Sequence, residues 1–180
     1  DRGPDDGAVD YHCRVQLLEL EISGVPESSV SAAVRRTIIF TDSDGRRFSG
    51  SSAAIDATKK MGHRLDPEGF RFGSDGSMFV SDEYGPHVIQ FSADGSEQKR
   101  FQLPAHFTVA NPDADKKKEN SLNQTGRASN RGLEGLAISQ DGRHLVAVMQ
   151  GPLLPPSTWR FGPICVKFVV RMLGWSGCCR

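Results

Sequence analysis

The most constraining feature of this 180-residue sequence is a pattern that occurs twice at one register. In the first copy, Glu68-Gly69 precedes an apolar run that Asp75-Gly76 ends; in the second copy, Glu134-Gly135 and Asp141-Gly142 take the same places. Seven positions separate the glutamate from the aspartate in each copy, and 66 residues separate the copies. Asp-Gly between two apolar runs is typical of a hairpin, because glycine tolerates the positive φ of the turn. The sequence therefore predicts repeated antiparallel hairpins.

The first copy extends beyond its hairpin into a unit of four predicted strands, at residues 70–72, 78–80, 87–91 and 98–103. Repeated four-stranded units of about 40–50 residues are the signature of a β-propeller. A chain of this length holds only about three to four such blades, whereas closed propellers have about 4–8. The expected fold class is therefore all-β: a partial β-propeller of four-stranded antiparallel blades, an incomplete piece of a larger fold.

The expected domain is residues 1–154, with residues 104–130 as an insertion loop. The insertion has no clear periodicity and carries Lys116, Lys117, Lys118 and Arg127. Long loops in compact domains are usually functional or disordered. Two interpretations stay open: a solvated loop, or a lid that grips an anionic substrate. The insertion also contains the sequon Asn123-Gln124-Thr125, which matters only in a secreted protein.

Residues 155–180 depart from this pattern, because they contain four basic residues, both tryptophans and no acidic residue. We expect an atypical basic and apolar tail outside the domain; a membrane-surface segment at 164–173 is the alternative. The four cysteines, at positions 13, 165, 178 and 179, form no CxxC pair. Neither a zinc ribbon nor a disulfide framework is therefore expected.

The charge balance limits the classes of partner. Lysine plus arginine and aspartate plus glutamate number 22 each, so the formal net charge is zero. This balance provides no electrostatic basis for binding nucleic acid. We expect no transmembrane segment, since no apolar run approaches the length that a bilayer requires, and no signal peptide is visible in this chain. The sequence does not indicate an oligomeric state.

Carboxylates gather around the predicted strands of both copies. In a propeller the innermost strand of each blade meets the central channel, so we expect Glu68 and Glu134 to converge there, with Asp66, Asp82 and Glu83 on nearby turns. Like charges this close resist joint ionisation unless a positive charge neutralises them. A divalent cation with oxygen ligands, Ca²⁺ above all, is the expected cofactor. Its expected ligands are Glu68, Glu134, Asp66 and Asp82.

Such a cation polarises a phosphoryl or carbonyl oxygen and lowers the pKa of a bound water. The catalytic candidates are Glu68, Asp82, Glu83, Glu134 and Arg131, where Arg131 orients an anionic ester through charge-assisted hydrogen bonds. The competing interpretation is that carboxylates beside turns accept backbone N–H bonds and fix the hairpin. It is preferred for the aspartates of the Asp-Gly turns, Asp75, Asp94 and Asp141. The sequence has no GxSxG or HExxH motif, which argues against a serine triad or a zincin.

Three segments together resemble a known family. They are LDPEG at 65–69, VSDEYGP at 80–86 and NRGLEGLAIS at 130–139, in this order and joined by a polar insertion. These motifs, together with the opening DRGP, resemble the phytase-like domain described by the esterase-like activity of phytase, over about residues 1–154. The resemblance implies a metal-dependent β-propeller of secreted or cell-envelope proteins.

The function implied by this resemblance is hydrolysis of a phosphate monoester, with a small anionic ester as substrate. Two alternatives stay open. One is a non-catalytic propeller that serves as a binding platform with a structural calcium ion. The other is a lactonase-like propeller hydrolase, which also holds a metal in its channel. Whether this chain completes such a site, and so is an enzyme at all, stays open at this stage.

Overall fold

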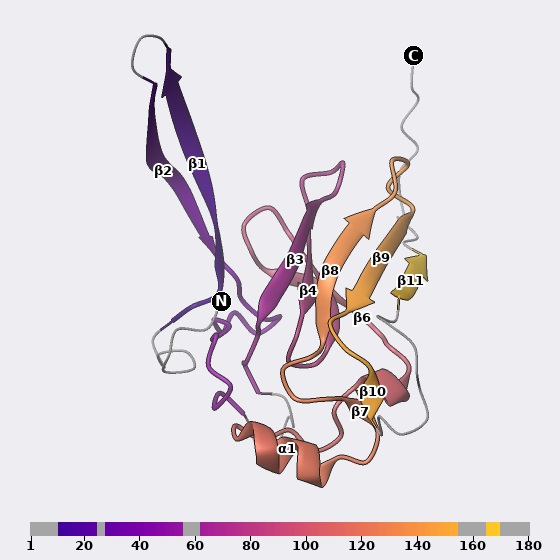
Figure 1. Cartoon of the computed structure of the whole chain (residues 1–180). Helices are drawn as coiled ribbons and strands as arrows, with labels where there is room; N and C mark the ends of the chain where they lie inside the picture. Colours follow the sequence, from indigo (N-terminus) through magenta and orange to yellow (C-terminus); the bar gives the residue numbers. More distant parts are fainter. Residues whose placement is uncertain (1–10, 25–27, 56–61, 155–164, 170–180) are drawn as a thin grey trace.

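The computed structural model describes residues 11–24, 28–55, 62–154 and 165–169. These residues are mostly β-strands, arranged in small antiparallel sheets (Figure 1). In chain order the elements are β1 (Arg14–Ser23), β2 (Ser29–Ile39), β3 (Pro67–Phe72), β4 (Met78–Asp82), β5 (His87–Phe91), β6 (Glu97–Phe101), η1 (Ala105–Phe107), α1 (Lys116–Leu122), β7 (Gly126–Arg127), β8 (Leu133–Ile138), β9 (His144–Met149), β10 (Leu153–Leu154) and β11 (Cys165–Val169). The prediction of a β-rich chain is confirmed. No closed sheet forms among the described strands, so the propeller architecture stays a prediction.

The first repeat is the four-stranded meander that the sequence predicts. Its strands pair antiparallel in the order β3-β4-β5-β6. The strands alternate their side chains between two faces, and both faces are buried. One face packs Phe79, Val88 and Phe101 into a core shared with β8 and β9. The other face packs Met78, Val80, Ile89 and Phe91 against Cys13, Phe40 and Phe48 from the preceding part of the chain. The sheet is thus the middle layer of the molecule.

The second repeat forms a sheet in the order β11-β9-β8. Strands β3 and β8 lie side by side in the fold (Figure 1). Strand β11, from the part of the chain expected to lie outside the domain, pairs antiparallel with β9 along five residues. The domain boundary at residue 154 stays a prediction.

Four turns in the structure share one hydrogen-bond pattern. In each, the N–H of the glycine in an Asp-Gly pair donates to the carbonyl three residues earlier, at Gly45, Gly76, Gly95 and Gly142. Gly76 has a φ of 81° and Gly142 a φ of 68°, which explains why the sequence requires glycine there. The carboxylates of Asp75, Asp94 and Asp141 each accept the N–H two residues later. The prediction that these aspartates fix hairpins is confirmed.

The insertion at 104–130 contains short regular elements, and most of its side chains are exposed. Whether it is a solvated loop or a lid stays a prediction. It contains η1, α1 and β7, and Asp115 caps α1 by accepting the N–H of Lys118. Its only strongly buried charges in the described structure are Glu119 and Arg127, which pair with each other. Sequence periodicity missed this segment because its elements are short and its stability comes from buried polar contacts. Arg127 is therefore unavailable for gripping a substrate.

A buried ion triad joins the insertion to the first repeat. Glu119 accepts hydrogen bonds from Arg64 and from Arg127, at 2.8 Å each. Arg127 also donates to the carbonyl of Tyr84, in the turn that follows β4. Burial raises the pKa of Glu119, but the charge of Arg127 and the hydrogen bonds from both arginines outweigh it, so this pKa lies below its usual value. The triad thus fixes α1 to the turn that follows β4.

The side chain of Asn123, the sequon residue, joins two segments of the insertion through hydrogen bonds to their backbone. Its side-chain oxygen accepts the N–H groups of Ala110 and Asn111, and its nitrogen donates to the carbonyls of Asn111 and Glu119. Asn123 is only 6% exposed, so an attached glycan would disrupt these bonds.

We expect protein secreted in folded form from a eukaryotic host to carry no glycan at Asn123, as measured by intact mass before and after deglycosylation. Thr125→Ala, which removes the sequon, should change the intact mass only by the difference between the two residues and should leave the yield unchanged. A glycan on the native protein would contradict this prediction.

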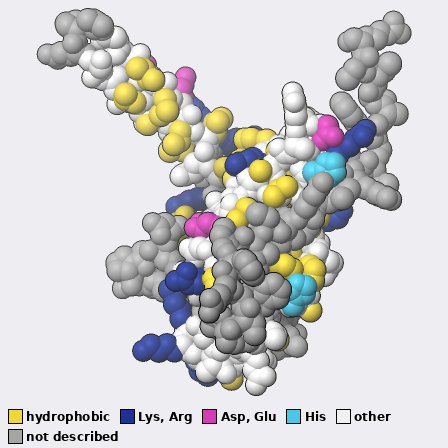
Figure 2. Space-filling model, turned by 45° about the vertical axis from the view of Figure 1, so that its right-hand side comes forward, with side chains coloured by type: hydrophobic (Ala, Val, Ile, Leu, Met, Phe, Trp, Pro, Cys, Tyr) yellow, Lys and Arg dark blue, Asp and Glu magenta, His cyan; other side chains and the backbone are white. Residues whose placement is uncertain are grey.

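Strands β1 and β2 form a long hairpin that projects from the body of the molecule (Figure 1). Apolar side chains gather along it (Figure 2). Leu18 faces Val34 and Ile22 faces Val30 across the two strands, and each of these side chains keeps at least half of its surface exposed. Two-stranded hairpins are marginally stable on their own. The base of the hairpin, in contrast, is joined to the core through Cys13 and Phe40.

Cys13 is a buried free thiol. Its sulfur donates to the carbonyl of Leu65 at 3.1 Å, and burial raises its pKa to about 12. A thiol that stays protonated is a poor nucleophile and metal ligand. The other three cysteine side chains lie outside the described residues. Within the described part of the chain, no helix is long and apolar enough to cross a membrane.

Candidate metal site

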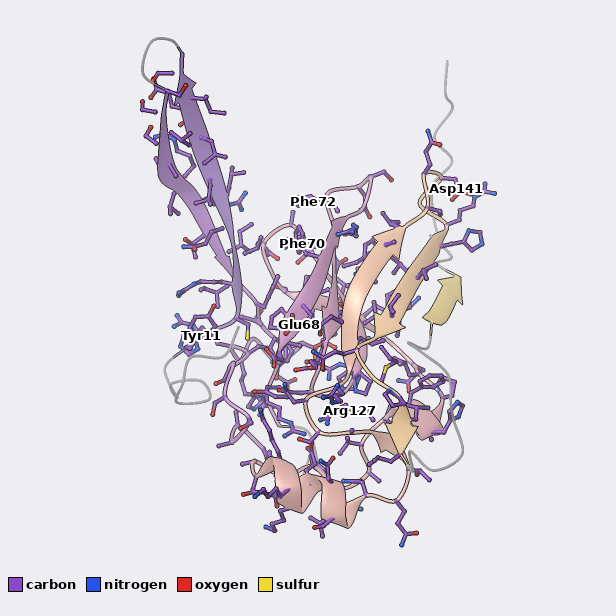
Figure 3. The ribbon with its side chains drawn as sticks, viewed as in Figure 1. Tyr11, Glu68, Phe70, Phe72, Arg127 and Asp141 are labelled. Carbon is purple, nitrogen blue, oxygen red and sulfur yellow. The ribbon has the colours of Figure 1, made fainter. Side chains whose placement is uncertain are left out.

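Three carboxylates meet where the first repeat begins and where its second strand ends. Ligand oxygens of Asp66, Glu68 and Glu83 all lie within 4.8 Å of one another. Among the described residues, no other three His, Cys, Asp or Glu side chains bring their ligand atoms this close together. Asp66 and Glu83 are buried, whereas Glu68 is exposed. Glu68 lies near the start of β3, at the opposite end of the strand from Phe72 (Figure 3). The group is therefore closed on one side and open to solvent on the other.

The spacing of these oxygens suits one hard cation. Ca²⁺ binds oxygen ligands at about 2.3–2.6 Å, so two ligands of one ion are at most about 4.6–5.2 Å apart. The 4.8 Å limit for the three carboxylates falls within that span. A set of three carboxylates also has the chemistry that Ca²⁺, Mg²⁺ and Mn²⁺ prefer over softer metals. The residues present therefore fit a divalent cation.

A β-bulge gives Glu68 its place. Strand β3 pairs with β4 at Pro67 and again at Phe70, and the register shifts between them. Bulges leave a residue outside the ladder and redirect its side chain. Beside it, a Cβ added to Gly69 would lie 2.6 Å from Cβ of Leu136, so the strand approaches β8 more closely than alanine allows. The Glu-Gly pair in the sequence thus combines a redirected carboxylate with a close contact between strands.

Glu83 is fixed to Asp66 by the backbone. The N–H of Glu83 donates to the carbonyl of Asp66 at 3.0 Å. Next to it, both oxygens of Asp82 are occupied, because they accept the N–H groups of Asp66, Tyr84 and Gly85. Burial raises the pKa of Asp82, and these backbone bonds oppose that shift. Asp82 thus holds the turn together and lies outside the group of three, whereas Glu83, expected only as a catalytic residue, lies inside it.

Glu134 occupies the equivalent bulge of the second repeat. The register of β8 with β9 shifts between Leu133 and Gly135, which leaves Glu134 outside the ladder. The hydroxyl of Ser81 accepts the N–H of Gly69 and donates to the carbonyl of Glu134, so it links the two bulges. Oε2 of Glu134 is buried and no hydrogen-bond partner reaches it. The structure places Glu68 and Glu134 on neighbouring strands, but Glu134 is not part of the three-carboxylate group; their convergence on one ion stays a prediction.

Backbone bonds show which residues of the two repeats correspond. The N–H of Glu83 donates to Asp66, and the N–H of Gln150 donates to Gly132 in the same way. The second hairpin has one residue more, since Gly73 pairs with Ser77 whereas Ser139 pairs with His144. Equivalent positions are therefore 66 residues apart on the first strand but 67 apart on the second. In the second repeat, glycine and glutamine thus replace Asp66 and Glu83, and only the glutamate is kept.

The segment before β8 packs directly on the site. A Cβ added to Gly132 would lie 2.0 Å from the carbonyl oxygen of Glu83, so the two backbones are in contact. Asn130 adopts a positive φ of 57°, and its Oδ1 is buried without a partner. Arg131 is exposed between them, and its stem lies against Gly151. The predicted anion-binding residue thus neighbours the site in the chain and faces solvent.

Two ring-bearing side chains, Tyr84 and His87, lie near the turn after β4. Tyr84 is buried and its hydroxyl donates to the carbonyl of Gly50 at 3.1 Å. Burial lowers the pKa of His87 to about 3, so this imidazole is neutral throughout the physiological range. A neutral ring is a poor general acid at neutral pH. Neither residue belongs to the carboxylate group.

The comparisons with known proteins bear on this site. The sequence matches the phytase-like family, described as esterase-like activity of phytase, over residues 4–174. This chain belongs to the phytase-like family. It is 30% identical over 199 residues to an uncharacterized secreted protein of Arthroderma benhamiae, an alignment that covers 85% of this chain and 39% of the relative. No solved structure matches.

The phytase-like match confirms the family that the LDPEG, VSDEYGP and NRGLEGLAIS segments predict. All three segments supply residues around the carboxylate group: Asp66 and Glu68, then Glu83, then Gly132 and Glu134. The chain spans 39% of the length of the secreted relative from Arthroderma benhamiae. What the whole protein does is therefore a matter of proposal.

Proposed function

We propose that this chain belongs to a secreted, cation-dependent hydrolase of phosphate monoesters. The observation that carries the proposal is the group of three carboxylates, with ligand oxygens within 4.8 Å of one another, built from the family's own sequence segments. Two of the three are buried, and a bound cation would offset the repulsion between carboxylates this close together. The secreted relative supports an extracellular location, where calcium is abundant.

In this proposal Asp66, Glu68 and Glu83 hold the cation. A bound Ca²⁺ would polarise a phosphoryl oxygen and make a bound water more acidic. The exposure of Glu68 leaves the group open on the side from which a substrate arrives. Arg131, exposed and one residue before the backbone contact with Glu83, orients the anionic ester. Glu134, with its unpartnered buried oxygen, is the remaining candidate for contact with cation or water.

We also propose that the two repeats are successive blades of a β-propeller. Strands β3 and β8, each with a bulged glutamate, would be the inner strands of their blades. Their close approach at Gly69 and Leu136 supports this arrangement. The buried outer face of the first repeat, packed against Phe40 and Phe48, supports a further blade before it.

Calcium binding by calorimetry tests the site. The chain should bind Ca²⁺, and Glu68→Gln and Glu83→Gln should each weaken binding at least about tenfold, because each removes a charged ligand. Asp75→Asn is the matched control, since Asp75 is occupied by Ser77 in a turn at the far end of β3. Equal affinity of the control and both glutamine variants would refute the site.

Hydrolysis of p-nitrophenyl phosphate separates the enzyme from its alternatives. We expect Ca²⁺-dependent release of nitrophenol that chelation abolishes and that Arg131→Gln slows with a raised KM. Calcium binding without turnover would favour a binding platform with a structural ion. Turnover of a lactone in place of the phosphate ester would favour a lactonase-like hydrolase.

A further inference from the structure

The side chain of Gln150 lies against the carboxylate group from the second repeat. Gln150 follows β9 and corresponds to Glu83 in the first repeat, because each donates its N–H to the residue that precedes the repeat's first strand. The second repeat therefore presents an amide where the first presents a carboxylate.

The amide of Gln150 has one end that faces two oxygens. They are the carbonyl oxygen of Asn130, at 2.8 Å, and Oε1 of Glu83, at 3.1 Å. Both are acceptors, so the end that faces them is the NH₂ group, which can donate to both. One hydrogen-bond donor thus connects the loop before β8 to a carboxylate of the candidate metal site.

We propose that Gln150 is a positioning residue, which holds Glu83 where it can share a cation with Asp66 and Glu68. This inference rests on the proposed cation site. Three carboxylates within reach of one ion repel one another before the ion binds. A hydrogen bond to Glu83 favours its charged form and fixes its direction, and the bond to Asn130 fixes the donor in turn. A carboxylate at position 150 would instead add a fourth negative charge.

The experiment uses Tb³⁺ as a luminescent probe of the calcium site on the full chain. Gln150→Met keeps the length of the side chain and removes the donor. We expect about tenfold weaker Tb³⁺ binding. Loss of a residue that hydrogen-bonds to a metal ligand typically weakens metal binding by about 10–100-fold, and the lower end applies here because Gln150 is exposed. We also expect more bound water, from luminescence lifetimes in H₂O and D₂O, since a released Glu83 is replaced by solvent. Gln150→Asn, whose amide is too short to reach, should behave in the same way, and Gln140→Met on the exposed β8–β9 turn should not.

The double variant Gln150→Met/Glu83→Gln decides whether the effect passes through Glu83. If it does, Gln150→Met adds no further loss of affinity when Glu83 is already changed. Equal affinity and hydration of wild type and both Gln150 variants, while Glu83→Gln still weakens binding, would overturn this inference alone. A wild-type chain that does not bind Tb³⁺ would overturn the cation site and this inference with it. Circular dichroism on each variant confirms that it is folded.

Discussion

Glu119→Gln is expected to lower the free energy of unfolding by about 3–5 kcal/mol, because it leaves two buried arginines without a counter-charge. Arg64 and Arg127 bond Glu119 at 2.8 Å each, and the side chains of all three are at most 3% exposed. Denaturant unfolding followed by circular dichroism measures the change. The matched control is Glu19→Gln, which breaks the ion pair with Arg35 on the projecting hairpin, where the side chains are 62% and 57% exposed. Exposed pairs contribute about 0–1 kcal/mol, so equal losses in the two variants would contradict the buried triad.

The pH dependence of stability gives a second measure of the same triad. The pKa of Glu119 is lower in the folded protein than its ordinary value of 4.5. The triad's contribution is therefore complete above that ordinary value and is lost as pH falls through the folded pKa. Wild type should lose stability between pH 5 and acid pH more steeply than Glu119→Gln, in which this group no longer titrates. Parallel curves for the two proteins would show that Glu119 is not held in its charged form.

Gly132→Ala is expected to lower the free energy of unfolding by about 1–3 kcal/mol or more, the usual range for overpacking a rigid site. The new Cβ would lie 2.0 Å from the carbonyl oxygen of Glu83 and 2.7 Å from its carbonyl carbon, so backbone must move. Because Glu83 belongs to the carboxylate group, Ca²⁺ binding by calorimetry should weaken in the same variant.

Gly135→Ala is the control for this substitution. It lies three residues further along the same segment, and its Cβ would meet only Val148, at 3.7 Å, which is ordinary van der Waals contact. We expect a change in stability within about 0.5 kcal/mol, as for substitutions that meet none of the named causes of destabilisation. If Gly132→Ala bound Ca²⁺ and unfolded like Gly135→Ala, the contact between the loop and Glu83 would not matter for the site.

The strands and turns of the first repeat could be predicted from the sequence because their signals are local. Asp-Gly pairs mark the turns, and the apolar runs between them mark strands that are buried on both faces. The insertion could not be predicted in the same way. The folded structure of the insertion depends on Glu119, whose two arginine partners lie 55 and 8 residues away in the sequence. Such pairing leaves no periodic pattern in the sequence.

The candidate site was predicted in part for a similar reason. Glu68 follows from the Glu-Gly register, and Asp66 was expected on a turn beside it. Asp82 and Glu83 are adjacent in the sequence, and only the fold shows that Asp82 is used by backbone N–H groups. The second hairpin has one extra residue, so the separation between equivalent positions changes from 66 to 67 residues along the repeat. This change hid the correspondence of Glu83 with Gln150. Comparing turn lengths before aligning the second strands would have revealed it.

The shared turn pattern also affects how this protein ages chemically. Aspartate followed by glycine is the pair most prone to isomerise, because the glycine nitrogen attacks the neighbouring carboxyl carbon and forms a cyclic imide. In the four Asp-Gly turns that the structure describes, the glycine N–H is already engaged with a carbonyl three residues earlier. Three of the aspartates are also held by the N–H two residues later. Folding therefore shields these four bonds from slow covalent damage. At these positions the time spent unfolded, rather than the time in solution, should set how fast the backbone isomerises.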